Sequence, residues 1–295
     1  MVNDHGQSYG MQGNPAEGKM KKGTCPMCLI SDTDLRESHF MPAALYGLMR
    51  TDEYEPVRFS GEAIYPTSKQ TKHPLFCGWC EQLLNREGES WIMPLLPTLG
   101  GPFPLRERLT KQSPISQTGS LKLYSTATNP EIDVPKLMHF GAGIFYKAAV
   151  HSWVKDGTKP RIELGRDDTE ALRLNLLGRG DLPKHMALCI TVDSATVVWQ
   201  SFVEPYRAEN HEELARYVFY VPGIFTQLIV GESAQEVAKT SCINANDLRP
   251  VLFENVSISM RNTAREMAAN ARKTKKLDAT TQEIEKRGLS VRLGD

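Results

Sequence analysis

The spacing of apolar residues predicts two helices in the part of the chain that follows residue 135. Between residues 136 and 154, large apolar side chains recur every three or four positions, which is the spacing of one helix face. We therefore expect a buried helix over 136–154. Its Gly141-x-Gly143 step indicates close helix packing rather than a phosphate loop, because no strand precedes it. A second helix is expected over 168–180, capped by Asp168 or Thr169 and ended by Gly178 or Gly180.

Four runs between residues 186 and 231 show a different pattern. They are short, rich in β-branched and aromatic residues, and separated by turn residues. These features predict the strands of an antiparallel sheet, so helices and sheet together place the chain in the α+β class. The runs are MALCITVD (186–193), ATVVWQSFVEP (195–205), RYVFYVPG (216–223) and IFTQLIVG (224–231).

Changes in composition divide the chain into five stretches. The first is polar and Gly-rich, which predicts disorder. The third is rich in Pro, Gly, Ser and Thr, and we expect a long connection there with a short hairpin around SLKLYS. The stretches are a disordered N-terminus (1–22), a cysteine-containing module (23–95), a Pro/Gly-rich linker (96–135), an α+β domain (136–260) and a basic helical C-terminal tail (261–295).

Composition and hydropathy indicate the expected compartment and the chemical state of the cysteines. Lys plus Arg and Asp plus Glu are balanced at 35 each, so the overall charge favours neither a nucleic-acid nor a membrane partner. No apolar run approaches the length of a membrane span, and the N-terminus lacks the apolar core of a signal peptide, so we expect a cytoplasmic protein. In that reducing compartment, paired cysteines indicate metal ligation rather than disulfides. Cys189 and Cys242 are isolated and are predicted to be packing residues.

Two CxxC pairs carry the strongest chemical signal. Cys25 and Cys28 lie in GTCPMCLI, where a tight turn lets both sulfurs face one ion. Cys77 and Cys80 lie in LFCGWCEQLLN at the start of an expected helix, whose partial positive charge favours thiolates. A knuckle, a hairpin and a helix that supplies the last two ligands form a treble clef, so we predict a structural Zn²⁺ site. The alternative is four cysteines that pack in a core or form a redox pair.

The order of these motifs resembles that of the HNH-like ββα-metal proteins. SHFMP (38–42) lies between the first CxxC pair and FCGWCE (76–81), as an x-His-x-x-Pro strand does in that family. SHFMPAALYGLMR and LFCGWCEQLLNREGE are similar to segments of an uncharacterised bacterial HNH-like branch. The resemblance covers residues 23–95. It implies a ββα zinc fold and a metal-dependent endonuclease, often one that belongs to a mobile element or an anti-phage system.

The resemblance also implies roles for individual residues. The histidine of the x-His-x-x-Pro strand is the general base in active members, and here it is His39. The position before it is Ser38, a weak neutral ligand, and the position after the last cysteine is Glu81, a suitable ligand for a catalytic Mg²⁺ or Mn²⁺. The Asn that orients the base is missing, and His73 is its nearest substitute. The implied catalytic residues are His39, Glu81 and His73.

The sequence leaves two interpretations of His39 open. Phosphodiester cleavage needs a base of near-neutral pKa and a cation that polarises the phosphate, and His39 and Glu81 are of the residue types that provide them. In the other interpretation, His39 hydrogen-bonds to the backbone and fixes the hairpin. Spacing alone does not decide between these interpretations.

The C-terminal segment is a second candidate for contact with nucleic acid. A polar helix is expected over 257–288, and its part RNTAREMAANARKTKK (261–276) carries six basic residues against the single acid Glu266. Several of them would share one helix face and follow a phosphate backbone. The alternative is a solvated terminal helix. The six are Arg261, Arg265, Arg272, Lys273, Lys275 and Lys276.

Three hypotheses for function follow from these features. The first is an HNH-type endonuclease with structural Zn²⁺ and a catalytic cation, acting on DNA or RNA. The second is a non-catalytic zinc protein that binds nucleic acid or a protein partner. The third is a thiol redox sensor that releases zinc on oxidation. The retained His-x-x-Pro and Glu81 favour the first, whereas Ser38 and the missing Asn favour the second. From the sequence we predict the endonuclease, with the non-catalytic zinc protein as the alternative.

Overall fold

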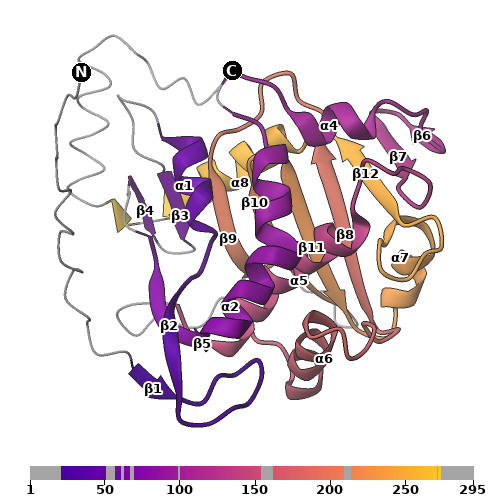
Figure 1. Cartoon of the computed structure of the whole chain (residues 1–295). Helices are drawn as coiled ribbons and strands as arrows, with labels where there is room; N and C mark the ends of the chain where they lie inside the picture. Colours follow the sequence, from indigo (N-terminus) through magenta and orange to yellow (C-terminus); the bar gives the residue numbers. More distant parts are fainter. Residues whose placement is uncertain are drawn as a thin grey trace, which may run out of the picture.

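The computed structural model describes residues 21–50, 57–60, 63–66, 70–98, 100–153, 162–208, 214–270 and 272–273 (Figure 1). Within these ranges the chain forms a three-stranded sheet near the N-terminus and a ten-stranded sheet, with helices packed on both. The mixed α+β class predicted from the sequence is confirmed.

The strands of the described residues are β1 (Lys21–Gly23), β2 (Thr33–His39), β3 (Val57–Ser60), β4 (Ala63–Pro66), β5 (Lys72–Cys77), β6 (Ser116–Thr118), β7 (Leu121–Ser125), β8 (Met186–Asp193), β9 (Phe202–Arg207), β10 (Ala215–Val221), β11 (Ile224–Val230), β12 (Pro250–Glu254) and β13 (Arg272–Lys273). The helices are α1 (Ala43–Met49), α2 (Gly78–Leu84), the π-helical turn η1 (Asn85–Glu89), α3 (Ser90–Ile92), the 3₁₀ turn η2 (Met93–Leu95), α4 (Pro104–Leu109), α5 (Val134–Val150), α6 (Arg166–Leu176), α7 (Ala234–Ser241) and α8 (Val256–Asn270). Among these described helices, none combines the length and the apolar character that a membrane crossing requires.

The large sheet is mixed rather than purely antiparallel. Its order is β13-β4-β3-β9-β10-β11-β8-β12-β7-β6. The central block β9-β10-β11-β8 is antiparallel, as the sequence predicts. Within this block, a tight turn at Gly223 with φ of 83° joins β10 to β11. Parallel pairs flank this block, since β3 pairs with β9 and β12 pairs with β8 in the parallel sense.

Strand β8 is covered on both faces. Every one of its eight residues is buried, which explains why MALCITVD is a nearly continuous apolar run. Alternate side chains, such as Leu188 and Ile190, join the main core, which α5 also lines. On the opposite face Ala187 and Cys189 pack in a small cluster with Cys242, which follows α7.

The small sheet has the order β1-β2-β5, and α2 continues directly from its last strand. Antiparallel pairing of β2 with β5 places Leu35 opposite Cys77 and Ser38 opposite His73, with a bulge between Arg36 and Glu37. The sheet has no separate core of its own. Phe76 of β5 stacks on Tyr146 of α5 at a ring-centroid distance of 6.1 Å. The buried residues of the small sheet therefore belong to the same hydrophobic cluster as most of the apolar core of the large sheet.

Helix α5 matches the predicted buried helix, with bounds of Val134–Val150 instead of 136–154. A Cβ on Gly141 would lie 3.2 Å from the Cγ2 atom of Thr226, and one on Gly143 would lie 3.3 Å from Leu84. The Gly-x-Gly step therefore allows close packing of α5 against β11 and α2, as predicted from the sequence.

Two of the predicted boundaries are wrong for identifiable reasons. Asp168 and Thr169, the expected caps of the second helix, lie inside α6, which begins at Arg166 after Gly165. The Asp168 carboxylate pairs with His185 at 2.7 Å. The predicted end of α6 is confirmed, because Gly178 has φ of 65°. The predicted strand 195–205 is shorter, and β9 begins at Phe202. The Trp199 N–H donates to the Ser257 hydroxyl at 2.9 Å and is therefore not available to a strand ladder.

The predicted linker and module contribute directly to the large sheet. The segment 96–135 contains α4, whose Leu105 and Leu109 are buried in the main core, and the predicted hairpin, formed by β6 and β7. β7 pairs with β12, so this segment is an integral part of the fold. Residues assigned to the cysteine-containing module supply β3 and β4. The predicted disordered N-terminus, up to residue 20, and the end of the basic tail, from residue 274, lie outside the described residues.

The close approach of η1 to α5 leads to a first prediction. A Cβ added to Gly88 would lie 2.9 Å from the backbone nitrogen of Phe140, so Gly88→Ala must push the two helices apart. We expect this variant to lose about 1–3 kcal/mol of unfolding free energy in urea titrations. Gly47→Ala is the matched control, because its Cβ would meet nothing within 4 Å and Ala favours the helix. An unchanged stability of Gly88→Ala would contradict the packing described here.

Candidate metal centre

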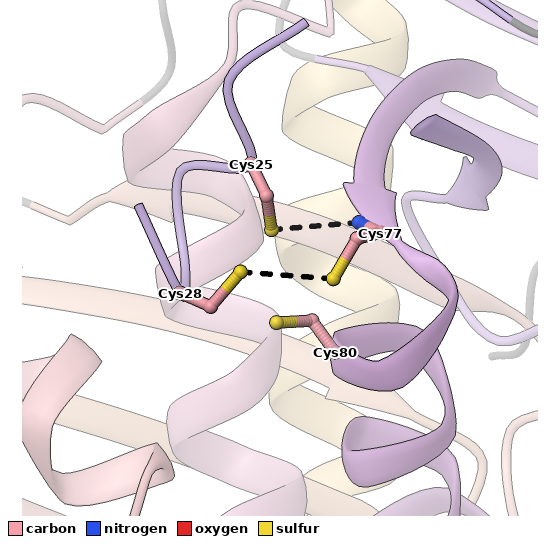
Figure 2. Close-up of side chains that lie close together, drawn as sticks. All are labelled: Cys25, Cys28, Cys77 and Cys80. Atoms are coloured by element: carbon pink, nitrogen blue, oxygen red, sulfur yellow. Dashed lines mark hydrogen bonds between the residues drawn. The ribbon is translucent and has the colours of Figure 1, made fainter. Parts of the chain in front are cut away.

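The first cysteine pair lies in a turn that closes through its own backbone. The Leu29 N–H donates to the Cys25 carbonyl at 2.9 Å, and the Cys25 N–H donates to the Ile30 carbonyl at 3.0 Å. Leu29 adopts the left-handed conformation with φ of 64°, which turns the chain sharply after Cys28. As a result, the sulfurs of Cys25 and Cys28 point toward one centre (Figure 2).

The second pair lies at the corner between β5 and α2. Cys77 ends β5 and is the N-cap residue of α2, and Cys80 lies in the first turn of that helix. The Cys77 N–H donates to the sulfur of Cys25 at 3.4 Å (Figure 2). A backbone N–H that points at a sulfur stabilises its thiolate form. The corner thus supplies two ligands and helps to hold a third.

The four sulfurs have the spacing of a tetrahedral metal site. All four lie within 4.8 Å of one another, and the Cys28 and Cys77 sulfurs are 3.7 Å apart. Four sulfurs placed about 2.3 Å from a zinc ion would be about 3.8 Å apart, so this separation matches the edge of such a tetrahedron. It is far longer than a disulfide, at about 2.05 Å. The residues present therefore fit a metal such as zinc.

The pKa values of the cysteine thiols favour a cation at the centre. A hydrogen bond with Cys25, together with burial, raises the pKa of the Cys80 thiol far above its ordinary range. Burial raises the pKa of Cys28 as well, whereas the hydrogen bond from Cys80 lowers the pKa of Cys25. One thiolate is thus stabilised by neighbours that stay protonated. A divalent cation among the four sulfurs would allow all of them to ionise.

Two side chains from distant helices hold the turn between Cys25 and Cys28. The Tyr146 hydroxyl of α5 donates to the Pro26 carbonyl at 2.8 Å, and the Arg173 guanidinium of α6 donates to the Met27 carbonyl at 2.7 Å. Glu170 accepts two further hydrogen bonds from that guanidinium, each of 2.7 Å. These contacts are not recognisable in the sequence, because they join residues 120 and 146 positions apart.

Ser38 and Glu81, which the HNH-like resemblance assigns to the cation, lie in contact. The Ser38 hydroxyl donates to the Glu81 carboxylate, and the Phe76 N–H donates to the same hydroxyl at 3.2 Å. Ser38 is fully buried, and Glu81 is partly exposed. Burial raises the pKa of Glu81, and the hydrogen bond from Ser38 opposes that rise. The carboxylate is therefore satisfied by a neutral partner.

His39 points away from this pair. The β2–β5 ladder places Ser38 opposite His73 and His39 opposite Lys72. Successive residues of a strand face opposite sides, so the His39 side chain shares its face with Lys72 and Glu37, whose ion pair measures 3.8 Å. Burial, and then the positive charge of Lys72, lowers the pKa of His39, so the imidazole is neutral at pH 7.

His73 has a partner that sequence reasoning missed. Its ring stacks on His151, just after α5, at a centroid distance of 3.9 Å and an interplanar angle of 22°. Burial is the main cause that lowers the pKa of both imidazoles. The hydrogen bonds and ring contacts of the described residues join His73 to neither His39 nor Glu81. The structure therefore places the three predicted catalytic residues on the antiparallel pair β2–β5 and the first turn of α2, without a hydrogen bond or ring contact that joins them.

The four cysteines are the one group, within the described ranges, in which three or more potential ligands lie close enough to hold a common ion. His39, Glu81 and His73 do not form a second group of that kind. Cys189 and Cys242 are buried in the small cluster beside α7, in agreement with the predicted packing role.

The predicted basic stripe lies mostly beyond the described side chains. Arg261 of α8 donates to the Val197 carbonyl at 3.2 Å. The side chains of Arg265, Arg272 and Lys273, and all of Lys275 and Lys276, lie outside the described part of the chain. A nucleic-acid interface on this segment stays a prediction.

Comparison of the chain with protein-family models, with curated proteins and with solved structures finds no match. The HNH-like resemblance therefore rests on the motifs alone. The metal centre rests on its own geometry.

The Tyr146 hydroxyl provides a test of how the centre is supported. Tyr146→Phe keeps the ring and removes the donor to Pro26, and the loss of such an outer partner typically lowers metal affinity by about 10–100-fold. We expect zinc affinity, measured by competition with a chromogenic chelator, to fall about tenfold. Tyr217→Phe is the control, because it removes a similar bond to the Glu163 carbonyl at 2.7 Å. Equal affinities of wild type and Tyr146→Phe would refute the supporting role.

Leu29 provides a test of backbone strain. A left-handed conformation costs a non-glycine residue roughly 1–2 kcal/mol, and the greater flexibility of unfolded glycine offsets part of the gain on replacement. We expect Leu29→Gly to raise the unfolding free energy of the zinc-loaded protein by about 0.5–1 kcal/mol. Leu29→Ala removes the side chain but retains the strain, and it should not stabilise. A loss of stability in Leu29→Gly would show that the leucine side chain supports the fold.

Proposed function

We propose that the chain is a structural-zinc protein of treble-clef type that acts by binding a partner and not by hydrolysis. One observation carries the proposal: four cysteines close around one centre, and three of them are buried. Four thiolates complete the tetrahedral coordination of zinc and leave no position for a substrate or an activated water. The ion would therefore support the fold.

The surrounding elements support the treble-clef assignment. A turn with two cysteines precedes the antiparallel pair β2–β5, and α2 begins at the second cysteine pair. The residues between β2 and β5 supply α1 and two strands of the large sheet. In this proposal the module is an HNH-like ββα unit into which strands of a larger body are inserted.

The state of Glu81 supports a non-catalytic role. Its carboxylate accepts the hydroxyl of Ser38, a buried neutral residue at a position where a cation ligand is expected in active relatives. A catalytic cation prefers several oxygen or nitrogen ligands. The His39 side chain lies on the opposite face of β2 from Ser38 and therefore does not point toward Glu81. The described residues contain no second group of three or more ligands, so no further cation would be held in place to polarise a phosphate.

Metal-dependent phosphodiester hydrolysis is the second candidate, and the contact between Ser38 and Glu81 favours it. These positions, which precede His39 and follow Cys80, meet as the HNH-like resemblance requires. A Mg²⁺ or Mn²⁺ ion bound by Glu81 would polarise the phosphate. His39, whose pKa is lowered, would be neutral and able to accept a proton from water.

One experiment separates the two candidates. Zinc-loaded wild type, His39→Ala and Glu81→Gln are incubated with plasmid, linear DNA and RNA in Mg²⁺ or Mn²⁺, and products are resolved on gels. We expect no cleavage above that of His39→Ala. Cleavage that is lost in both variants, but kept in His185→Ala, would establish the hydrolase and contradict the proposal. His185 is a suitable control because it pairs with Asp168 of α6.

Zinc content tests the centre itself. Purified wild type should contain about one equivalent of zinc per chain by elemental analysis, and Cys77→Ser should contain much less. Removal of the ion by a strong chelator should lower the thermal unfolding midpoint, because metal binding and folding are coupled. Full zinc content in Cys77→Ser would contradict the four-cysteine assignment.

A further inference from the structure

The metal centre is bordered by exposed apolar side chains. Among the described residues seven large hydrophobic side chains are exposed, and three of them adjoin the cysteines: Leu29 at 56%, Ile30 at 59% and Trp79 at 55%. The other four are dispersed along the chain: Ile115, Val197, Leu248 and Ile258. Single exposed apolar residues need no explanation, but a group of three around one centre does.

These three residues border the same centre. Leu29 directly follows Cys28, and Trp79 directly precedes Cys80. Because the sulfurs of Cys28 and Cys80 lie within 4.8 Å of each other, the two segments are held side by side at the cysteines (Figure 2). We call Leu29, Ile30 and Trp79 the knuckle surface.

The fold does not account for the leucine of this surface. Leu29 holds a left-handed conformation that glycine adopts without strain, and more than half of its side chain is in contact with solvent. It is also absent from the hydrophobic core that contains Cys25 and Met27. A strained residue whose side chain points to solvent indicates a role outside the folded chain.

One positive charge lies beside the knuckle surface. The Arg36 guanidinium approaches Gly78, since a Cβ on that glycine would lie 3.5 Å from the Arg36 Nε atom. Gly78 is the neighbour of Trp79. Arg36 is exposed and forms no ion pair with the described residues, whereas Lys22 pairs with Asp34 at 3.7 Å. The surface thus combines apolar area with one cation that has no carboxylate partner in this part of the chain.

We propose that the knuckle surface binds a segment of a protein partner that presents large apolar side chains next to a carboxylate. The apolar side chains would cover Leu29, Ile30 and Trp79, and the carboxylate would pair with Arg36 in the bidentate manner that guanidinium groups favour. This inference rests on the proposed structural-zinc centre, because the ion would hold the two bordering segments together.

The composition of the surface argues for protein over other occupants. Nucleic acids engage several cations and stacked aromatic rings, but here two of the three apolar residues are aliphatic and one cation adjoins them. A stable dimer buries about 800 Å² per partner, more than three half-exposed side chains offer. A large aromatic residue flanked by aliphatic ones and an arginine is typical of the centre of a protein interface.

The test selects peptides on the zinc-loaded full-length chain. Random 12-residue peptides displayed on phage are selected, and the enriched peptides are synthesised with a fluorescein label and titrated by anisotropy. We expect enriched peptides to combine large apolar residues with Asp or Glu.

Affinity should fall at least about tenfold in Trp79→Ser and in the double variant Leu29→Ser/Ile30→Ser. Arg36→Gln should weaken acidic peptides several-fold and leave their Asn/Gln versions unchanged. Val197→Ser is the control, and its affinity should equal that of wild type.

Several outcomes would overturn the proposal. The first is a failure to enrich any peptide, and the second is equal peptide affinity of wild type and Trp79→Ser. The third is Trp79-dependent binding of a dT20 or U20 oligonucleotide that is tighter than peptide binding. The fourth is a wild-type dimer in light scattering that dissociates in Trp79→Ser. Zinc content is measured on every sample. A chain that retains about one zinc but shows one of these outcomes refutes the knuckle surface alone. A wild-type chain without zinc refutes the metal centre and the surface together.

Discussion

The convergence of four sulfurs joins two segments that lie far apart in the sequence, the turn after β1 and the corner between β5 and α2. The turn from Cys25 to Ile30 lacks regular secondary structure, and β1, which leads into it, has only three residues. Cys25 and Met27 are nevertheless fully buried, so the turn is part of the core. Ionised sulfurs repel one another unless a cation lies between them. The hydrogen bond between Cys80 and Cys25 is the largest cause that raises the pKa of Cys80 and lowers the pKa of Cys25. The packing of the turn therefore depends on how the charge at its centre is balanced.

Helix α5 connects this centre to the large sheet through contacts on both sides. Tyr146 holds the cysteine turn, and one helical turn away Gly143 and Gly141 allow close contact with α2 and β11. The next residue after Tyr146, Lys147, is buried and pairs with Glu89 of the π-helical turn at 2.6 Å. A buried ion pair need not add net stability, but removal of one partner leaves a costly unpaired charge. The pair thus restricts how η1 can lie against α5.

The sequence revealed those features that depend on local spacing. Two CxxC pairs are recognisable because ligands three positions apart face one ion, and α5 is recognisable because its apolar period matches one helix face. Asp168 was misjudged as a cap because its true partner, His185, is distant in sequence. Residues 195–201 look like a strand, yet the backbone N–H of Ala195 is bound by the Asp193 side chain and that of Trp199 by Ser257. Long-range partners such as Arg173 leave no periodic trace, so only the fold shows them.

The residue at position 38 determines how the partly buried carboxyl group of Glu81 is stabilised. Burial alone would drive this carboxyl toward its neutral form, and a second carboxylate at position 38 would drive it further unless a cation lay between the two. A serine hydroxyl is neutral and short, so it can donate to Glu81 while it accepts the Phe76 N–H. The same hydroxyl thus links the strand ladder to the first turn of α2. Because Ser38 is buried and Glu81 lies in the first turn of α2, these two hydrogen bonds fix the corner between β5 and α2.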